Sequence, residues 1–424
     1  MSAEDSTAPS VKWMTRIIPG VLLLIVAYTT YVVVGRICVD FLLRERHETG
    51  LTVAFLVLYF VFLILGVSSY ARTLWVVKTD PGFVPLHPTS RGARVLQNNK
   101  SRRGGTSRGG AFGRRYDDNR GDEEAATANV GYTMADQNPD SPGLETFYSR
   151  DIFVCEGDGR PKWCHDCGQW KPDRVSHSRE VDRCVRKMDH FCPWVGGMVA
   201  GNSFKFFAQF TFYAWLLCAV ALSASAYTLA KHLQQGLVLD GHVIAVIFFS
   251  SFLGLFSFGM SVTAIRFISK NMTNIDLVKK GTSYHLAVRV PLGTAPTDKF
   301  GTITYPLPKA PRAQLEGHVA PAAETERDAR AKRTFAILRT EPGDEPWDLG
   351  FKRNWTEVMG HSPFDWLLPI KRPPSERHDS GVSEYPYGPL IAELRVRHGL
   401  DPKLWTDRDE AIEMREKRGG GRPV

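Results

Sequence analysis

Four long blocks of apolar residues separate the polar stretches of this chain. Each block is uncharged over about 20 residues, enough for a helix rising 1.5 Å per residue to cross about 30 Å of hydrocarbon. Charged side chains such as Arg36, Asp40, Arg72 and Arg266 occur only toward block ends. The blocks are Ile17–Leu43, Leu51–Val77, Phe206–Ala230 and His242–Ile268. The pattern predicts an all-α polytopic membrane protein with four transmembrane helices.

The basic residues predict how these helices are oriented. The first block is longer than the apolar region of a signal peptide, so we expect it to stay in the membrane. With four spans, the N-terminus, residues 78–205 and the tail after Ile268 share one side, which carries nearly all Lys and Arg. The opposite turns carry few, chiefly Arg44, Arg46 and Lys231. The basic side is therefore expected to be cytosolic, where cysteines stay reduced.

The polar stretches suggest further divisions. The net charge is +8, and residues 90–121 contain SRRGGTSRGGAFGRR, which has the look of an Arg-Gly RNA-binding tail. The composition of residues 90–121 favours a disordered insert instead, so no nucleic-acid partner is expected. The composition of Leu315–Arg333 likewise predicts a disordered segment. The predicted parts are a cytosolic N-terminus (1–16), helices 1 and 2 (17–77), a linker with the disordered insert (78–159), a cysteine-rich domain (160–205), helices 3 and 4 (206–268) and a cytosolic tail (269–424).

The stretch between the second and third helices carries most of the candidate chemistry. It reads CHDCGQWKPDRVSHSREVDRCVRKMDHFCPWVGGMVAGN from Cys164 to Asn202. Cys164 and Cys167 form a Cys-x2-Cys pair, and His177 and Cys184 follow. Three thiolates and one imidazole are the ligand types of a structural zinc site, so we expect one zinc ion here.

Cys192 has three interpretations on its spacing alone: a zinc ligand, a buried structural thiol or a nucleophile. The nucleophile is favoured by the four other ligands that already complete a zinc site, and by His190 and Asp189 just before Cys192. An imidazole that accepts the thiol proton raises the reactive fraction, and a carboxylate can orient that imidazole. A second-shell or zinc role for His190, and a helix-capping role for Asp189, remain open.

These residues resemble the cysteine-rich domain of the DHHC protein S-acyltransferases, with the tetrad Asp189-His190-Phe191-Cys192 reading DHFC. An aromatic third letter occurs in some fungal members, so the resemblance implies a fungal type. It also implies the catalytic roles for Cys192, His190 and Asp189.

The family pattern has two zinc sites, and only one is complete in this chain. The second set of ligands would fall on Ser178, Val181, Phe191 and Met198, so all four are missing. We therefore expect a single zinc, and we expect Val181, Phe191 and Met198 to pack together in place of the second.

Three shorter motifs extend the resemblance. Asp80-Pro81-Gly82 matches the family's DPG signature, which by itself reads as a helix stop and turn. Residues 273–276 read TNID where the family has Thr-Thr-x-Glu, which puts in doubt whether the contact of this motif with the active-site region is made in the family's way. Residues 345–369 resemble the C-terminal aromatic motif and are expected to pack back onto the membrane core.

The resemblance implies transfer of a palmitoyl group from palmitoyl-CoA to cytosolic cysteines of membrane-associated proteins. An acyl-enzyme on Cys192 is expected, in an endomembrane (ER or Golgi) or plasma membrane. Trp194 is a candidate contact near the thioester, and CoA phosphate contacts are expected among nearby cations, whose alternative role is an ordinary solvated surface. These cations are Lys171, Arg174, Arg179, Arg183, Arg186 and Lys187.

Two other classes of function compete with this one. A catalytically silent zinc-containing membrane adaptor is the main alternative, because the second set of ligands is missing. A small transporter is disfavoured because the spans hold few charges that would mark a pathway. Formation of an acyl-enzyme separates the first function from both others.

Overall fold

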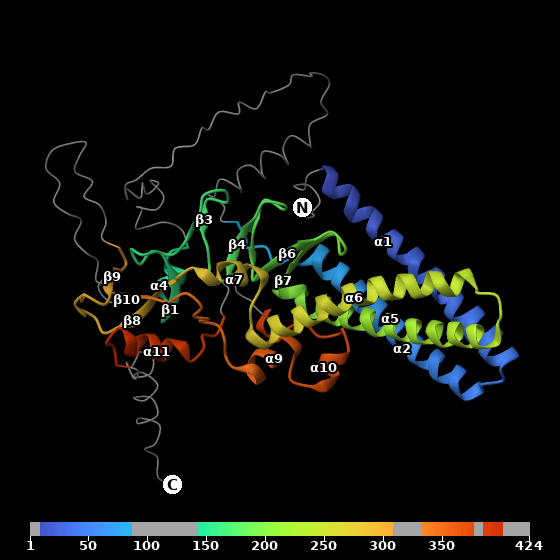
Figure 1. Ribbon diagram of the computed structural model, residues 1–424. Helices are drawn as coiled ribbons and strands as arrows, with labels where there is room; N and C mark the ends of the chain where they lie inside the picture. The colour runs from blue at the N-terminus through green and yellow to red at the C-terminus, as the bar shows by residue number, and fades with distance from the viewer. Residues whose placement is uncertain (1–8, 87–142, 308–331, 377–384, 402–424) are drawn as a thin grey trace, which may run out of the picture. The chain divides into compact units, whose positions relative to one another are not determined.

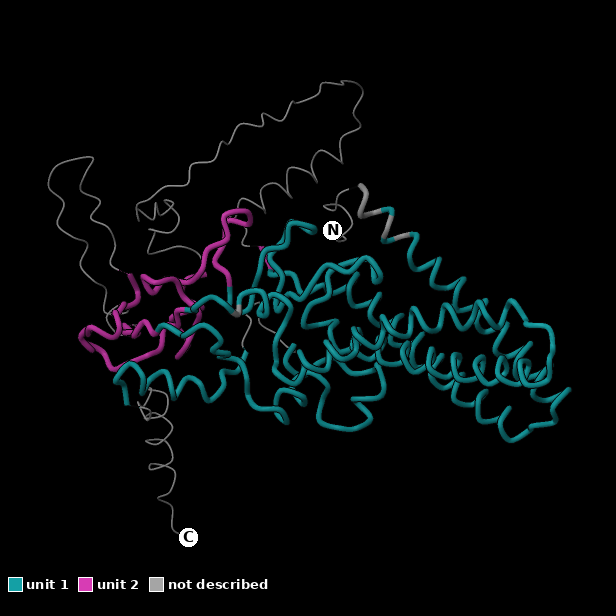
Figure 2. The backbone as a smooth tube through the Cα atoms, in the orientation of Figure 1, with its two compact units in different colours: residues 1–84, 172–284, 339–402 teal, residues 85–171, 285–338, 403–424 magenta. Residues whose placement is uncertain are grey.

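The computed structural model describes residues 9–86, 143–307, 332–376 and 385–401 (Figure 1). The Arg/Gly-rich residues 90–121 and most of Leu315–Arg333 lie outside the described residues. The chain divides into two compact units, coloured separately in Figure 2. Unit 1 comprises residues 1–84, 172–284 and 339–402, and unit 2 comprises residues 85–171, 285–338 and 403–424.

Among the described residues of unit 1, four helices are long and apolar enough to cross a membrane, as predicted. The first span combines α1 (Pro9–Thr30) with the π-helical η2 (Tyr31–Glu45). The others are α2 (Thr49–Thr79), α5 (Gly201–Gln235) and α6 (Gly241–Lys270). α5 begins five residues before the predicted Phe206, because its first turns are buried rather than exposed to lipid.

Small residues let these helices approach closely. Ala221 and Ala224 of α5 are fully buried in a cluster with Val33, Ile37 and Tyr59. Such close packing is how transmembrane helices gain contact energy, since lipid tails are as apolar as the side chains themselves. Their outer faces instead expose large apolar side chains, including Leu24, Ile64, Phe252 and Leu255.

The charged Arg36 within the first span has a partner. Its guanidinium lies 2.9 Å from the carboxylate of Asp240, which also caps α6 by accepting a hydrogen bond from the backbone N–H of His242. The pair fixes the turn between α5 and α6 to the first span, away from the residues predicted to be catalytic.

The prediction of an all-α chain is too narrow, because both units contain strands among the described residues. In unit 1, hairpins pair β4 (Val175–Ser178) with β5 (Arg183–Arg186) and β6 (Met188–Cys192) with β7 (Gly197–Ala200). α7 (Asn274–Val278) and the short η3 (Lys279–Gly281) follow α6. Turns every few residues leave no room for helices in this stretch.

Unit 2 is built on a four-stranded sheet in the order β1-β8-β10-β9. Its core contains Phe153, Tyr305 and Phe335. A small hairpin and one helical turn complete the described part. The elements are α4 (Glu145–Tyr148), β1 (Ile152–Cys155), β2 (Trp163–Cys164), β3 (Gln169–Trp170), β8 (His285–Val290), β9 (Gly301–Tyr305) and β10 (Arg333–Arg339).

The tail of unit 1 packs onto the ends of the membrane helices, as expected for the aromatic motif. Asn354 is fully buried, and its side-chain amide donates 2.8 Å to the Ser269 carbonyl at the end of α6. Tyr213 and Gln209 of α5 donate to the carbonyls of Leu367 and Trp366. The tail elements are α9 (Phe351–Met359), α10 (Pro363–Leu367), η4 (Pro374–Glu376) and α11 (Leu390–Arg397).

Candidate active site

The β6–β7 hairpin brings together the three residues predicted to be catalytic. His190 and Cys192 are two residues apart on β6, so strand alternation turns both side chains to one face. The β6–β7 pairing is irregular between Met188 and His190, and this irregularity lies at Asp189. A bulge re-aims a side chain, and here it leaves Asp189 beside the imidazole rather than on the opposite face.

Asp189 holds both His190 and the segment after α6. Its Oδ2 lies 2.6 Å from His190 Nδ1, and its Oδ1 accepts a 2.7 Å hydrogen bond from the backbone N–H of Asn274. The carboxylate is 4% exposed, so few water molecules compete for these bonds. Since Nδ1 is bound to Asp189, Nε2 is the imidazole nitrogen left for the thiol.

The surroundings of His190 favour its protonated form. Burial lowers its pKa, but the hydrogen bond to Asp189 and the interactions with Cys192 outweigh burial and raise the pKa to about 9. The ring also packs edge-on against Phe207 of α5, with 5.5 Å between centroids. This histidine is therefore oriented by a carboxylate on one side and by an aromatic ring on another.

Cys192 is 4% exposed and lies in an apolar cluster at the ends of the membrane helices. The cluster includes Val77 of α2, Phe207 of α5 and Phe267 of α6. Such surroundings exclude water and suit an apolar group.

Trp194 follows the thiol by two residues. Its carbonyl accepts a 2.7 Å hydrogen bond from the Tyr70 hydroxyl of α2, and its ring lies 5.6 Å from that of Phe256 on α6. The indole is thereby placed between the hairpin and the membrane helices. Tyr70 and Phe207 were not singled out from the sequence, because nothing in an apolar span marks which aromatic residue will meet a distant hairpin.

The segment TNID, residues 273–276, contacts the active-site region. The contact is made by the backbone of Asn274, so the side chain at this position does not decide it. Thr273 and Asp276 cap α7 reciprocally through their side chains, which directs the Asn274 N–H toward Asp189.

The four predicted metal ligands lie together. The ligand atoms of Cys164, Cys167, His177 and Cys184 are all within 4.8 Å of one another. In unit 1 the β4–β5 register places His177 directly opposite Cys184. Three thiolates and one imidazole at this spacing fit the tetrahedral geometry of zinc, which lies about 2.0 to 2.3 Å from such atoms.

The positions of the missing second set of ligands form an apolar cluster, as predicted. Val181 and Met198 are 2% and 1% exposed, and the partly buried Phe191 packs against them. Across the hairpin, Phe191 pairs directly with Met198. The fourth position, Ser178, is also buried, and its hydroxyl donates to the Glu180 carboxylate at 2.7 Å.

Arg174 does not fit the expected role in CoA binding. Its side chain is 1% exposed, and its guanidinium lies 2.6 Å from the Asp276 carboxylate and donates to the carbonyl of Asn271. The rings of Trp347 and Tyr385 stack near it, at 5.1 and 5.5 Å. A phosphate group cannot reach a guanidinium enclosed in this way, so Arg174 connects the hairpin region to α7 and the tail.

The other predicted cations differ in their surroundings. Lys187 is buried, and burial together with Arg174 lowers its pKa to about 8. Arg183 donates to the Val84 carbonyl and lies over the ring of Phe83. Arg179 is exposed, whereas Arg186 and Lys171 are partly buried.

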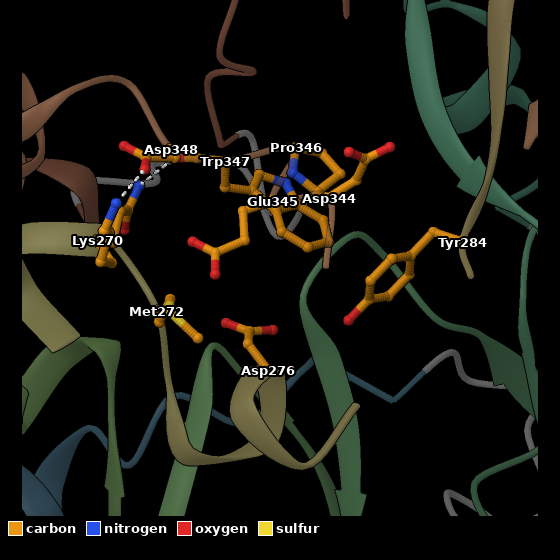
Figure 3. A pocket seen from close by; sticks show the side chains of 10 residues that line it. Lys270, Met272, Asp276, Tyr284, Asp344, Glu345, Pro346, Trp347 and Asp348 are labelled. Atoms are coloured by element: carbon orange, nitrogen blue, oxygen red, sulfur yellow. Dashed lines mark hydrogen bonds and ion pairs between the residues drawn. The ribbon is translucent and has the colours of Figure 1, made fainter. Parts of the chain in front are cut away.

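A separate pocket lies where the tail meets α7 (Figure 3). The carboxylates of Asp276 and Glu345 and the hydroxyl of Tyr284 turn into it, while Lys270 pairs with Asp348. Burial and the nearby Asp276 raise the pKa of Tyr284 to about 12, so its hydroxyl stays neutral. An acidic lining repels phosphate, and none of the predicted catalytic residues contributes to this pocket.

Comparison with known proteins gives one consistent result. Residues 158–281 match the family model described as DHHC palmitoyltransferase. The chain is 38% identical to palmitoyltransferase pfa5 of Aspergillus fumigatus, over 92% of this chain and 90% of the relative. It is 36% identical to palmitoyltransferase pfa5 of Emericella nidulans, over 92% and 87%. With palmitoyltransferase PFA3 of Candida albicans it is 25% identical, over 55% and 54%.

Proposed function

The chain belongs to the DHHC palmitoyltransferase family, and from this premise we propose that it transfers palmitoyl groups through an acyl-enzyme on Cys192. The donor is palmitoyl-CoA, and the acceptors are cytosolic cysteines of membrane-associated proteins. The observation that carries this assignment is the hydrogen-bonded Asp189–His190 pair on the same strand as a buried thiol.

The first step forms the acyl-enzyme. The proton of Cys192 moves to His190, and the raised pKa of His190 together with Asp189 favours the resulting imidazolium. The Cys192 thiolate attacks the carbonyl carbon of palmitoyl-CoA, a new carbon–sulfur bond forms, and the bond to the CoA sulfur breaks. The departing CoA thiolate takes the proton from His190, which leaves His190 neutral while Cys192 is acylated.

The second step passes the acyl group to the protein substrate. His190 accepts the proton of the substrate cysteine, whose thiolate attacks the acyl-enzyme carbonyl. Cys192 leaves as a thiolate, and His190 keeps the proton taken from the substrate, which restores the starting pair. One thioester replaces another in both steps, so the sequence of reactions needs no ATP.

The substrate groups have matching surroundings in unit 1. The apolar cluster around Cys192 and the exposed ring of Trp194 suit the acyl chain near its thioester. Cationic side chains pair with phosphate oxygens, so Arg179 and Arg186 are the remaining candidates of unit 1 for the CoA phosphates. Lys171 belongs to unit 2 and stays a prediction from the sequence. The enclosed guanidinium of Arg174 supports excluding it from this set.

A single zinc ion would be held by Cys164, Cys167, His177 and Cys184. Zinc supplies no reaction step here, because four protein ligands leave no open coordination position for a substrate. Its contribution is to the folding of the stretch that carries the hairpin. The cluster of the buried Val181 and Met198 with the partly buried Phe191 supports a count of one rather than two.

We place the protein in an endomembrane or the plasma membrane, with four crossings and the active site on the cytosolic side. The four long apolar helices support multiple crossings. The cytosolic side follows from the excess of Lys and Arg on the side that carries the hairpin.

The deciding experiment measures acylation of the purified full-length protein in detergent. Incubation with an alkyne analogue of palmitoyl-CoA is expected to label the wild type with a hydroxylamine-sensitive thioester, and Cys192→Ala and Cys192→Ser to abolish the label. Cys218→Ala is the matched control, because it removes a cysteine of α5 without touching the hairpin. If the folded, zinc-loaded wild type takes no label, the result would instead support a catalytically silent membrane adaptor. The missing second set of zinc ligands is the observation that favours this alternative.

A further inference from the structure

An open apolar groove runs along one outer face of α2. Its volume is about 480 Å³. One wall is α2 itself, and the other is the tail segment that follows α10. The groove is lined by Ile64, Leu65, Ser68, Ala71, Arg72, Trp75, Leu368, Pro369 and Ile370.

The groove is separate from the candidate active site. Tyr70 and Leu74 of α2 pack against the cluster that contains Cys192. Ala71 and Trp75, one residue later in each case, line the groove. Successive residues of a helix point about 100° apart, so the two faces of α2 are distinct.

Arg72 lies at the depth of lipid phosphates if α2 crosses the bilayer as proposed. Counted from Thr49, at 1.5 Å per residue, Arg72 is about 34 Å along the helix, just beyond about 30 Å of hydrocarbon. Ile64 is about 12 Å deeper by the same rise. The groove therefore starts at headgroup level and continues into the hydrocarbon, which matches the layout of one phospholipid.

The guanidinium of Arg72 is held in place without a carboxylate. It lies over the Phe206 ring at 5.4 Å and donates a long 3.4 Å hydrogen bond to the Ile370 carbonyl. Within the described ranges no acidic side chain forms a salt bridge with it, although other basic side chains nearby, such as Lys371 and Arg372, have such partners. A cation at an apolar boundary is best satisfied by an anionic headgroup.

The second wall of the groove is anchored firmly. Tyr213 donates 2.6 Å to the Leu367 carbonyl, and Lys205 donates 3.0 Å to the Lys371 carbonyl, so the segment between them is tied to α5 at both ends. Phe364, Leu367 and Ile370 are nevertheless 73%, 53% and 65% exposed. Apolar side chains exposed beside membrane helices are stabilised by the interfacial layer of the bilayer.

We propose that this groove binds one anionic glycerophospholipid from the leaflet next to the active site. The phosphate pairs with Arg72, and one acyl chain lies along Ser68, Leu65 and Ile64 between α2 and the tail. The inference rests on the proposed crossing of the membrane by α2. Charge complementarity and the continuity of the groove with the lipid-facing surface of α2 identify a membrane lipid as the occupant.

Native mass spectrometry of the delipidated full-length protein tests the site. Dioleoylphosphatidylserine is the probe, and dioleoylglycerol is the same lipid without its phosphate. We expect the wild type and Arg72→Lys to bind a first phosphatidylserine about tenfold more tightly than Arg72→Gln, the effect of one lost charge-assisted contact. Ser68→Trp, which fills the groove, is expected to bind as poorly.

Arg266→Gln is the matched control, because Arg266 is an exposed arginine near the end of α6 that does not line the groove. It should bind as the wild type does. Equal affinity of wild type, Arg72→Gln and Ser68→Trp would overturn the site, as would equal affinity for dioleoylglycerol. Competition between palmitoyl-CoA and phosphatidylserine for the groove would also overturn it, because the groove would then hold the substrate.

Acylation of Cys192 on the same samples keeps the two proposals apart. Weak lipid binding by Arg72→Gln with acylation retained supports a lipid site separate from the reaction. Tight lipid binding by a wild type that never acylates supports the site while refuting the proposed reaction. Zinc content and thermal unfolding confirm that each variant is folded.

Discussion

Replacing Val181 by alanine tests whether apolar packing stands in for the missing second zinc site. Val181 is 2% exposed and contacts a cluster that includes the buried Met198 and the partly buried Phe191. We expect Val181→Ala to lower the stability of the protein while its zinc content stays at one per chain, because Val181 is not a metal ligand.

The magnitude follows from burial. The substitution removes two buried methyl groups, worth about 0.8 kcal/mol each, and leaves a cavity that adds to this loss. The expected change in unfolding free energy is therefore roughly 2 to 3 kcal/mol. Met198→Ala removes more volume at 1% exposure, so it should cost about 2 to 5 kcal/mol.

The assay is thermal unfolding in detergent, with zinc measured by elemental analysis on the same preparation. Val278→Ala is the matched control, since Val278 is 78% exposed and the same chemical change there should be nearly neutral. The reasoning is refuted if Val181→Ala and Val278→Ala unfold at the same temperature. Two zinc ions per wild-type chain would refute it independently.

Four further predictions concern the site and the residues around it. In Asp189→Asn, the His190 pKa should fall below about 9, because burial still lowers it while the interaction with the Asp189 carboxylate that raises it is lost; the alkaline limb of the pH profile of acyl-enzyme formation should move to lower pH, and an unchanged limb would contradict this. Since the pKa of His190 is raised in the folded protein, protonation of His190 stabilises the wild type fully below about pH 6.5, and this stabilisation disappears as the pH rises through about 9. Denaturation of the wild type and of Asp189→Asn at pH 6 and pH 10 measures the difference. Cys184→Ala should lose the zinc and unfold the cysteine-rich stretch, because structural zinc supplies about 10 to 16 kcal/mol in small zinc peptides; full zinc occupancy would exclude Cys184 as a ligand. Arg174→Lys should destabilise the protein by about 2 kcal/mol or more, because an ammonium cannot keep the contacts with both Asn271 and Asp276, and unfolding at the wild-type temperature would show that the enclosed guanidinium is dispensable.

The local features of this protein were readable from its sequence. The length and composition of four apolar blocks predict the four helices, among the described residues, that are long and apolar enough to cross a membrane, since a bilayer imposes one minimum length. The types and spacing of Cys164, Cys167, His177 and Cys184 predict a cluster that could hold a metal ion. The joint change of four positions to non-ligands likewise predicts the cluster of Val181, Phe191 and Met198. Each of these inferences depends on residue type and spacing within a short stretch.

Contacts between distant segments were decided only by the tertiary structure. Arg174 looked like a phosphate ligand, but Asp276, Trp347 and Tyr385 enclose it, and they come from segments about 100 to 200 residues later. The sequence TNID left open how this segment contacts the active site. The contact is made by the backbone N–H of Asn274, and residue types other than proline all carry such a group, so the sequence does not reveal it. The groove at Arg72 also needs two segments that are far apart in the chain. Residue type determines what a side chain can bind. Folding determines which groups of the protein contact that side chain, and whether solvent and ligands can also reach it.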